Sequence, residues 1–280
     1  MRLEDKVVVI TGAGAGLGRE CALLFADEGA RVVVSDVDED RAKHVAHEVD
    51  DAGGQAIAVR CDVAVEREVQ SLVGAAVDEF GKLDVMLANA GIPVPGFGTV
   101  PFEETTEESW RRVIDVNLTG VFFCGKHSVA PMIANGGGAI VVTSSAAALV
   151  AYPNFAIYVA SKAGVNGLVR AMATDLGKHN IRVNAICPTH GMSASFSPGA
   201  TGDVLGMSYE QAAVAGGQPW DPAAFPSPLQ APEPPSLRDN AYGALFLASD
   251  ESRYMSGVAF PTCDGGAHAR TSIPIPDRIG

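Results

Sequence analysis

Short apolar runs alternate with longer helix-forming segments along most of this chain, and this alternation strongly limits the folds available to it. Strand-like runs cover residues 6–11, 31–36, 56–62, 83–91, 138–145, 181–188 and 257–263. Segments with helical periodicity lie between them, at 17–28, 38–52, 106–117, 119–134, 154–178 and 236–248, and a further amphipathic segment ends near residue 80. Uninterrupted apolar strands are typical of parallel sheets covered on both faces. We therefore expect one α/β domain over 1–280, with a doubly wound parallel sheet of about seven strands and helices on both faces.

A glycine cluster, TGAGAGLG at 11–18, joins the first strand to the first helix. Gly12 can form the tight turn, and Gly16 and Gly18 let the backbone approach a pyrophosphate at the helix N-terminus. Asp36 ends the next strand, where its carboxylate can bind a ribose diol and would repel a 2′-phosphate. The alternative is a solvated aspartate at a strand end. The pattern predicts a Rossmann fold that binds NAD in preference to NADP.

Tyr158 and Lys162 stand four positions apart in YVASK, so they share one face of the expected helix. A phenol titrates near pH 10 and is a poor base unless nearby charges stabilise its anion. Lys162 and an oxidised nicotinamide would supply two cations, and a shift of about three units requires about 4 kcal/mol. We expect Tyr158 to act as general base in alcohol oxidation, with Ser145 binding the same oxygen. Ser145 could instead be a strand-end hydroxyl without a catalytic role.

With these motifs in order, the chain resembles the short-chain dehydrogenase/reductase family over nearly its whole length. TGAGAGLG fits that family's TGxxxGxG, and CDV (61–63), NAG (89–91) and DVNLTG follow in sequence. The resemblance implies a homodimer or homotetramer with a catalytic tetrad of Asn117, Ser145, Tyr158 and Lys162. By the same resemblance, Lys162 also holds the nicotinamide ribose and Asn117 supports a water path for protons. The alternative for Asn117 is a structural, helix-breaking amide. The implied cofactor-binding residues are Gly12, Gly14, Ala15, Gly16, Leu17, Gly18, Asp36, Val37, Asp62, Val63, Asn89, Ala90, Gly91, Tyr158, Lys162, Pro188, Thr189 and Ser193.

The chain departs from the family pattern in CPTHGMSAS, after the sixth strand. Thr189 stands where the family has glycine, and Ser193 stands at the position of a threonine that holds the nicotinamide carboxamide. Ser193 keeps the hydroxyl, so we expect the carboxamide to bind there. His190 could contact substrate or be a solvated loop histidine.

A proline-rich excursion, residues 188–235, interrupts the regular pattern and contains nine of the chain's 17 prolines. It follows the strand whose carboxyl end should border the cofactor. We predict a lid over an apolar pocket for a bulky or cyclic secondary alcohol or ketone, such as a steroid, terpenoid or cyclic diol. A subunit contact or a loosely ordered insertion is the alternative. The apolar side chains behind this prediction are Met192, Phe196, Leu205, Met207, Tyr209, Trp220, Phe225 and Leu229, preceded by Tyr152 and Phe155.

The formal charge of −13 argues against nucleic acid and membrane surfaces as partners. Five scattered cysteines and the absence of a signal-peptide pattern favour a cytoplasmic protein, with no metal site expected. The sequence thus predicts an NAD-dependent oxidoreductase acting on a small-molecule alcohol or ketone. Two alternatives stay open, an NAD-dependent isomerase or epimerase and a catalytically silent NAD-sensing interaction protein. Net NADH formation from alcohols would indicate the dehydrogenase, and epimer exchange without net NADH would indicate the isomerase. NAD binding with neither reaction would indicate the sensor.

Overall fold

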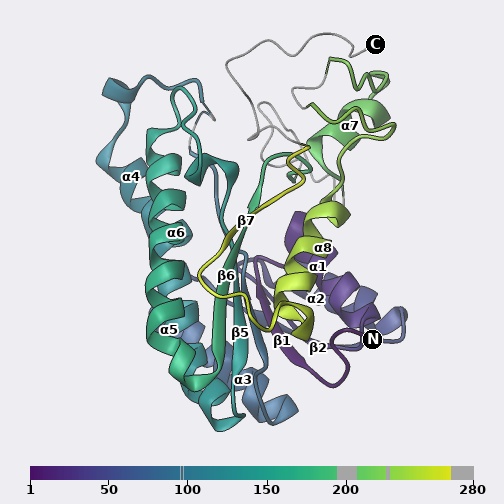
Figure 1. The fold of residues 1–280 in the computed structure, drawn as a ribbon, viewed down its shortest axis with the longest axis vertical. Coiled ribbons are helices and arrows are strands. Elements are labelled where there is room, and N and C mark those ends of the chain that lie inside the picture. The colour runs from purple at the N-terminus through teal and green to yellow at the C-terminus, as the bar shows by residue number, and fades with distance from the viewer. Residues whose placement is uncertain (95, 97, 194–206, 225–227, 266–280) are drawn as a thin grey trace.

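Seven strands form a single parallel sheet in the order β3-β2-β1-β4-β5-β6-β7 within the described part of this computed structural model. The structure describes residues 1–94, 96, 98–193, 207–224 and 228–265. The strand order reverses between β1 and β4, and this confirms the predicted doubly wound topology (Figure 1). The strands are β1 (Val7–Thr11), β2 (Arg31–Asp36), β3 (Gln55–Arg60), β4 (Val85–Ala88), β5 (Gly138–Thr143), β6 (Ile181–Pro188) and β7 (Ala259–Thr262).

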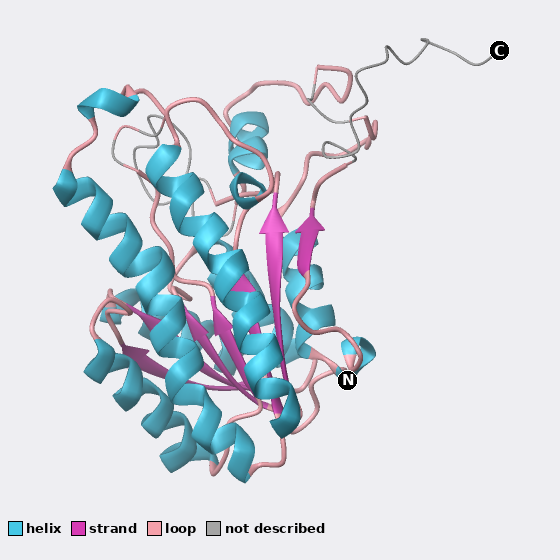
Figure 2. Cartoon of the chain, turned by 60° about the vertical axis from the view of Figure 1, so that its left-hand side comes forward, coloured by secondary structure: helices cyan, strands magenta, loops and turns pink. Residues whose placement is uncertain are grey.

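Two hydrophobic cores lie on opposite faces of the sheet, because neighbouring residues of a strand point to opposite sides. In β1, Val8 and Ile10 pack with α1 (Gly16–Asp27), α2 (Glu39–Asp51) and α8 (Leu237–Ala248). Val7 and Val9 pack with the helices of the other face, which are α3 (Glu66–Phe80), α5 (Gly120–Ala134) and α6 (Ala156–Leu176). The two helical layers are separated by the sheet in Figure 2. A strand buried on both faces reads as a continuous apolar run, which is the pattern seen in VVVIT.

The chain stays helical through Asn117, where the sequence suggested a break. The helix α4 (Glu107–Ile114) continues through a π-helical turn at Asp115–Thr119 directly into α5. The interpretation of Asn117 as a helix-breaking amide is therefore wrong, because the backbone accommodates it by widening one turn. Such π-turns are frequent at functional sites. Short 3-10 turns complete the elements, at Phe102–Glu104, Ala146–Ala148, Gly177–His179 and Asp250–Ser252.

The described part of the excursion lies above the carboxyl ends of the strands, next to the start of α8, and it contains the short helix α7 (Tyr209–Ala215) (Figure 1). Ser208 caps α7 by accepting a hydrogen bond from the Gln211 amide. Four residues of the predicted lid, Phe196, Leu205, Phe225 and the side chain of Tyr209, lie outside what the structure describes. Within the described residues, no helix has both the length and the apolar character needed to cross a bilayer.

Candidate active site

One cavity of about 320 Å³ at the carboxyl edge of the sheet joins the glycine-rich turn to the Tyr158–Lys162 pair. It runs past the topological switch point between β1 and β4, where ligands of doubly wound sheets bind. Its lining includes predicted site residues from both halves of the chain: Gly12, Ala15, Gly16, Leu17, Gly18, Asp36, Asn89, Ala90, Gly91, Ser145, Tyr158, Lys162, Pro188 and Ser193. Thus the fold brings together residues that lie far apart in the sequence.

The glycine-rich turn has the close backbone approaches that its sequence requires. Gly12 adopts a φ of +62°, and a methyl group there would lie 2.8 Å from the Ala90 Cα. A methyl group on Gly16 would come within 2.5 Å of the Ser193 hydroxyl, so Ser193 lies directly over the turn. The helix α1 starts at Gly16 and points its free N–H groups at the cavity. The turn is therefore shaped to bind an anionic group.

Asp36 lies at the end of β2 and faces this turn. Its Oδ2 accepts a hydrogen bond from the Gly14 amide at 3.0 Å, and its Oδ1 accepts one from the Asp38 amide at 3.1 Å. Arg41, one turn into α2, also lines the cavity and pairs with Asp38 at 3.3 Å. The carboxylate is thus fixed in the position predicted for recognition of a ribose diol.

Asn89 ties three strand ends together beneath the cavity. Its Nδ2 donates to the carbonyls of Thr11 and Gly12, and its Oδ1 accepts from the Thr143 hydroxyl at 3.0 Å. The amides of Asn89 and Ala90 donate to the Thr11 hydroxyl, both at 3.1 Å. This network fixes the spacing of β1, β4 and β5, and with it the floor of the cavity.

Tyr158, Ser145 and Lys162 meet at the other end of the cavity. Ser145 begins a 3-10 turn after β5, where its hydroxyl accepts from the Ala147 amide and also hydrogen-bonds Tyr158. Lys162 lies one turn along α6, and its Nζ donates to the Thr143 carbonyl at 2.8 Å. Its ammonium is 5.7 Å from the centroid of the Tyr158 ring. The i, i+4 spacing thus places both side chains on the face of α6 that lines the cavity.

The net shift of the Tyr158 pKa from the chain's own groups is upward, and the lowering expected from Lys162 and an oxidised nicotinamide together stays a prediction. Burial raises the pKa of the Tyr158 phenol to about 12, and the hydrogen bond from Ser145 offsets part of this rise. Burial likewise lowers the pKa of Lys162 to about 8. Both shifts disfavour the charged form, because removal from water costs an ion more than it costs a neutral group.

Asn117 is fully buried and holds the wall of the cavity without lining it. Its Oδ1 accepts from the Ile92 amide at 2.8 Å, and its Nδ2 donates to the Ile92 carbonyl at 2.9 Å. Ile92 itself lines the cavity, directly after the NAG motif. The π-turn therefore presents an amide that fixes the backbone opposite Lys162.

Five predicted cofactor residues do not line the cavity: Gly14, Val37, Asp62, Val63 and Thr189. The Gly14 amide is bound to Asp36. Val37 is 58% exposed, beyond Asp36. The Asp62 carboxylate accepts from the Ala64 amide, and Val63 packs against Gly120 at the start of α5. Thr189 has its hydroxyl directed at Asp264, to which it donates at 3.3 Å. The side chain that replaces the family's glycine thus attaches this loop to the end of β7.

His190 is buried, so its interpretation as a solvated loop histidine is wrong. Its side chain is about 9% exposed and its Nδ1 lies 4.0 Å from the Glu210 Oε1 of α7. Its backbone carbonyl accepts from the Asn240 Nδ2 of α8 at 2.8 Å. His190 therefore contributes to the contact between the loop and α7, and it is not among the residues that line the cavity.

Several site residues escaped the sequence analysis. Thr11 and Thr143 supply hydroxyl and carbonyl contacts, and Ile92 and Arg41 line the cavity. Thr11 begins the glycine motif and Thr143 precedes Ser145 by two positions. Their closeness to a motif was therefore the sequence signal that could have identified them as site residues. Arg41 had no such signal, because it belongs to α2 and meets the glycine-rich turn at Gly14 only through the tertiary fold.

A larger cavity of about 780 Å³ lies away from these residues, between α8 and the excursion. Trp220 and Leu229, two residues of the predicted lid, line this second cavity, and the Trp220 indole donates to the Ala231 carbonyl at 3.1 Å. Met192 lines the cavity that contains Tyr158. We assign the chemistry to the smaller cavity, because it holds the buried Tyr158–Lys162 pair together with the glycine-rich turn.

Fold and site together define a dinucleotide-binding protein with a buried Tyr/Lys pair beside its phosphate-binding turn. Residues 6–196 match the family model described as short chain dehydrogenase. The chain belongs to the short-chain dehydrogenase family, as its motifs predict.

Relatives match the chain over nearly its full length. The chain is 40% identical over 262 residues to the cis-4-hydroxycyclohexanecarboxylate dehydrogenase of Sinomonas cyclohexanicum, covering 94% of this chain and 96% of the relative. It is 38% identical over 256 residues to the mitochondrial borneol dehydrogenase of Lavandula x intermedia, covering 91% and 88%. A solved 7α-hydroxysteroid dehydrogenase, complexed with NADH and 7-oxoglycochenodeoxycholic acid, matches with a TM-score of 0.79 and 37% identity, covering 95% of each chain. All three are dehydrogenases by name, and this confirms the predicted class of enzyme.

Proposed function

We propose that this protein is an NAD-dependent dehydrogenase that interconverts a ring-containing secondary alcohol and its ketone. One observation carries the proposal: Tyr158, Ser145 and Lys162 line the same cavity as the glycine-rich turn and Asp36. A proton acceptor, a hydroxyl that can position the reacting oxygen and a dinucleotide-binding turn are thereby held in one site.

The residues of the cavity fit NAD. The turn at Gly12–Gly18 offers backbone N–H groups to a pyrophosphate, and Asp36 offers its carboxylate to a ribose diol. At the other end, Lys162 would hold the nicotinamide ribose. The Ser193 hydroxyl, which lies over Gly16, is the expected partner of the carboxamide. When bound, the oxidised nicotinamide accepts hydride from the alcohol carbon and places a positive charge beside the phenol.

Tyr158 would take the proton from the alcohol hydroxyl as the hydride leaves, with Ser145 hydrogen-bonded to the same oxygen. In ketone reduction Tyr158 would return that proton. Since burial raises the pKa of Tyr158 to about 12, the phenolate is scarce at neutral pH without a further cation. We therefore expect alcohol oxidation to accelerate as the pH rises, and ketone reduction to be favoured as it falls. Asn117 would position Ile92, and its role in a proton path stays a prediction.

Aromatic side chains lie beside Tyr158, which supports a ring-containing substrate. The rings of Tyr152 and Phe155 lie 6.1 Å apart, and those of Phe155 and Tyr158 lie 6.5 Å apart, both edge to face. Tyr152 is 42% exposed while Tyr158 is buried, so this row runs from the surface to the Tyr158 ring. The three relatives are named for cyclohexane, bicyclic terpenoid and steroid alcohols, which supports this substrate class. Whether the excursion serves as a lid stays a prediction.

A screen of NADH formation over steroid, terpenoid, cyclic-diol and aliphatic alcohols tests the proposal. We expect turnover on at least one cyclic alcohol, with loss of about 10³-fold in Tyr158→Phe. Tyr254→Phe removes the hydroxyl of a tyrosine that is 94% exposed, and it should leave turnover unchanged. Equal turnover of wild type and Tyr158→Phe would show that the assigned base is wrong. Epimer exchange without net NADH would favour an isomerase, and NAD binding without either reaction would favour a sensor.

We further propose a single cytoplasmic domain that assembles as a homodimer or homotetramer and binds neither nucleic acid nor membranes. The apolar side chains Trp110, Phe122 and Ile133 on α4 and α5 are each more than 40% exposed, which supports contact between copies of the chain. Size-exclusion chromatography with light scattering tests the assembly. A monomeric mass at micromolar concentration would contradict it.

A further inference from the structure

Residues 188–193 are the first residues of the excursion, at the end of β6, and four of them line the cavity: Pro188, Gly191, Met192 and Ser193. Gly191 has a φ of +62°, and a methyl group there would collide with the Ser236 carbonyl at the start of α8. The segment therefore follows a path that most residues could not adopt. Because Ser193 lies over Gly16 at the end of this path, the path sets the geometry of the cofactor site above the glycine-rich turn.

Two sides of this segment are held by the body of the domain. The Asn240 Nδ2 of α8 donates to the carbonyls of His190 and Gly191, at 2.8 and 3.0 Å. The Asn240 Oδ1 accepts from the Thr262 hydroxyl at 2.6 Å, which links the same amide to β7. Asn240 is fully buried, so these hydrogen bonds are shielded from water.

The excursion supplies the third side through Glu210, the second residue of α7. The Glu210 carboxylate is buried, with its Oε1 4.0 Å from the His190 Nδ1 and 3.4 Å from the Gly191 amide. Ser208, immediately before α7, forms a β-bridge with Ser193. A buried carboxylate is costly unless charged or hydrogen-bonding partners surround it, and this segment supplies two such groups, the Gly191 amide and the His190 ring.

We propose that Glu210 is a positioning residue that fixes the 188–193 segment from the side of the excursion, and thereby sets Ser193 against the glycine-rich turn. The helix α7 and the part of the cofactor site above the glycine-rich turn then act as one unit. The function assigned to Ser193 rests on the proposed dehydrogenase activity, whereas the placement of the segment by Glu210 does not. This assigns to the excursion a role in shaping the cofactor site, in addition to any contact with substrate.

Amide hydrogen exchange on the ligand-free protein and NADH titration by fluorescence test this proposal. In Glu210→Ala we expect exchange of residues 188–193 to be at least tenfold faster, with β2 unchanged, and the Kd for NADH to be about tenfold higher. Glu210→Gln keeps the size and one acceptor oxygen, so it should restore most of both values. Glu233→Gln removes the same charge at an exposed position of the excursion and should match wild type.

Turnover separates positioning from a loss of folded protein. A purely structural role would reduce the active fraction, and so the apparent kcat, while the folded remainder would bind NADH with wild-type affinity. We expect the opposite, a raised Kd for NADH and a raised KM for alcohol with circular dichroism unchanged. If Glu210→Ala is too unstable to purify, the double variant Glu210→Gln/His190→Gln replaces it. Faster amide exchange of residues 188–193 in that variant would then support the proposal, and unchanged exchange would overturn it.

Exchange of residues 188–193 and NADH affinity that both stay within twofold of Glu233→Gln would overturn the proposal. A protein that binds NADH but oxidises no alcohol would refute the proposed function and leave the Glu210 result standing. Conversely, alcohol oxidation that is insensitive to Glu210→Ala would refute the positioning role alone.

Discussion

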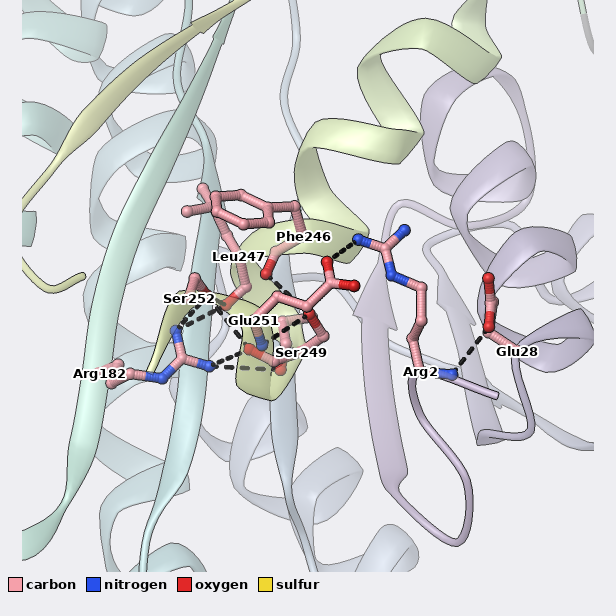
Figure 3. A network of polar contacts seen from close by, with 9 residues as sticks. Arg2, Glu28, Arg182, Phe246, Leu247, Ser249, Glu251 and Ser252 are labelled. Atoms are coloured by element: carbon pink, nitrogen blue, oxygen red, sulfur yellow. Dashed lines mark hydrogen bonds and ion pairs between the residues drawn. The ribbon is translucent and has the colours of Figure 1, made fainter. Parts of the chain in front are cut away.

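The two ends of the parallel sheet each hold a cation out of bulk water, Arg182 half-buried and Lys162 buried, and they stabilise it very differently. At the amino end, Arg182 near the start of β6 donates to the carbonyls of Leu247 and Ser249 and to the Ser252 hydroxyl, at 2.8 to 3.0 Å (Figure 3). At the carboxyl end, Lys162 has a hydrogen bond to the Thr143 carbonyl at 2.8 Å. Burial lowers the pKa of both side chains. A guanidinium titrates above about 12 and stays charged, whereas the Lys162 amine is brought close to physiological pH.

The difference separates a structural site from a reactive one. Arg182 satisfies carbonyls at the C-terminus of α8 that have no partner within the helix, so its charge stabilises the fold. Lys162 and Tyr158 are held in an environment that disfavours their charged forms, which is costly for stability but suits a site that moves protons. Stability and reactivity are thus assigned to opposite edges of one sheet, and substitutions at the two edges should affect different quantities.

Lys162→Met should have the largest effect on activity and an opposite effect on stability. We expect a loss of at least about 10³-fold in kcat/KM, or about 4 kcal/mol of transition-state stabilisation, because the ammonium beside Tyr158 is removed. The free energy of unfolding should rise by about 2 kcal/mol at pH 7, since a costly buried charge is lost. Urea denaturation measures it, with Lys178→Met at an exposed position as the control. A destabilised variant would contradict this account of Lys162.

The same comparison predicts a dependence on pH. The pKa of Lys162 is lowered to about 8 from its ordinary value of 10.5, so the folded state binds its proton less tightly than the unfolded state. The cost to the folded state is complete below pH 8 and fades as the pH rises from 8 to 10.5. The stability advantage of Lys162→Met should therefore shrink across this window, which unfolding curves at pH 7, 9 and 10 would detect. A constant advantage would mean that the lysine is not responsible.

Arg182→Met should lower stability and spare the chemistry. Removing the guanidinium leaves the carbonyls of Leu247 and Ser249 with Ser252 as their remaining donor. We expect a cost of about 2–4 kcal/mol, or roughly 5–10 °C in Tm. The kcat of the folded variant should stay within twofold of wild type, because Arg182 lies at the far end of β6. Arg253→Met, at an exposed position of the same edge, serves as the control. A large loss of kcat without a change in Tm would contradict the separation of the two edges.

Asp36→Ala tests the cofactor part of the carboxyl edge. We expect the KM for NAD to rise about tenfold, because the carboxylate that would bind the ribose diol is lost. The kcat at saturating NAD should change little. Parallel measurements with NADP show whether discrimination against the 2′-phosphate falls at the same time. An unchanged KM for NAD would remove Asp36 from the site.

Glu251→Gln should have the smallest effect. Glu251 pairs with Arg2 at the amino edge, and its side chain is about 52% exposed (Figure 3). Exposed ion pairs contribute little, so we expect a change below about 0.5 kcal/mol in the free energy of unfolding. A loss comparable to that of Arg182→Met would show that exposure does not govern the strength of ion pairs at this edge.

The sequence by itself determined the order of strands and helices, the glycine-rich turn and the shared face of Tyr158 and Lys162. Each depends on periodicity or spacing over a few residues, and these are local properties that backbone geometry fixes. The family motifs then indicated which strand ends would meet, and the structure brings Asp36, Ser145 and Lys162 to one cavity.

The tertiary structure alone decided what surrounds these groups. Burial set the direction of the Tyr158 pKa, and packing across the excursion placed Glu210 against His190. The direction of the Thr189 hydroxyl toward Asp264 likewise required the docking of β7 against the loop. Desolvation and long-range contacts depend on segments remote in sequence, which no local pattern encodes. For that reason the residues of this site could be predicted from the sequence, while their environment could not.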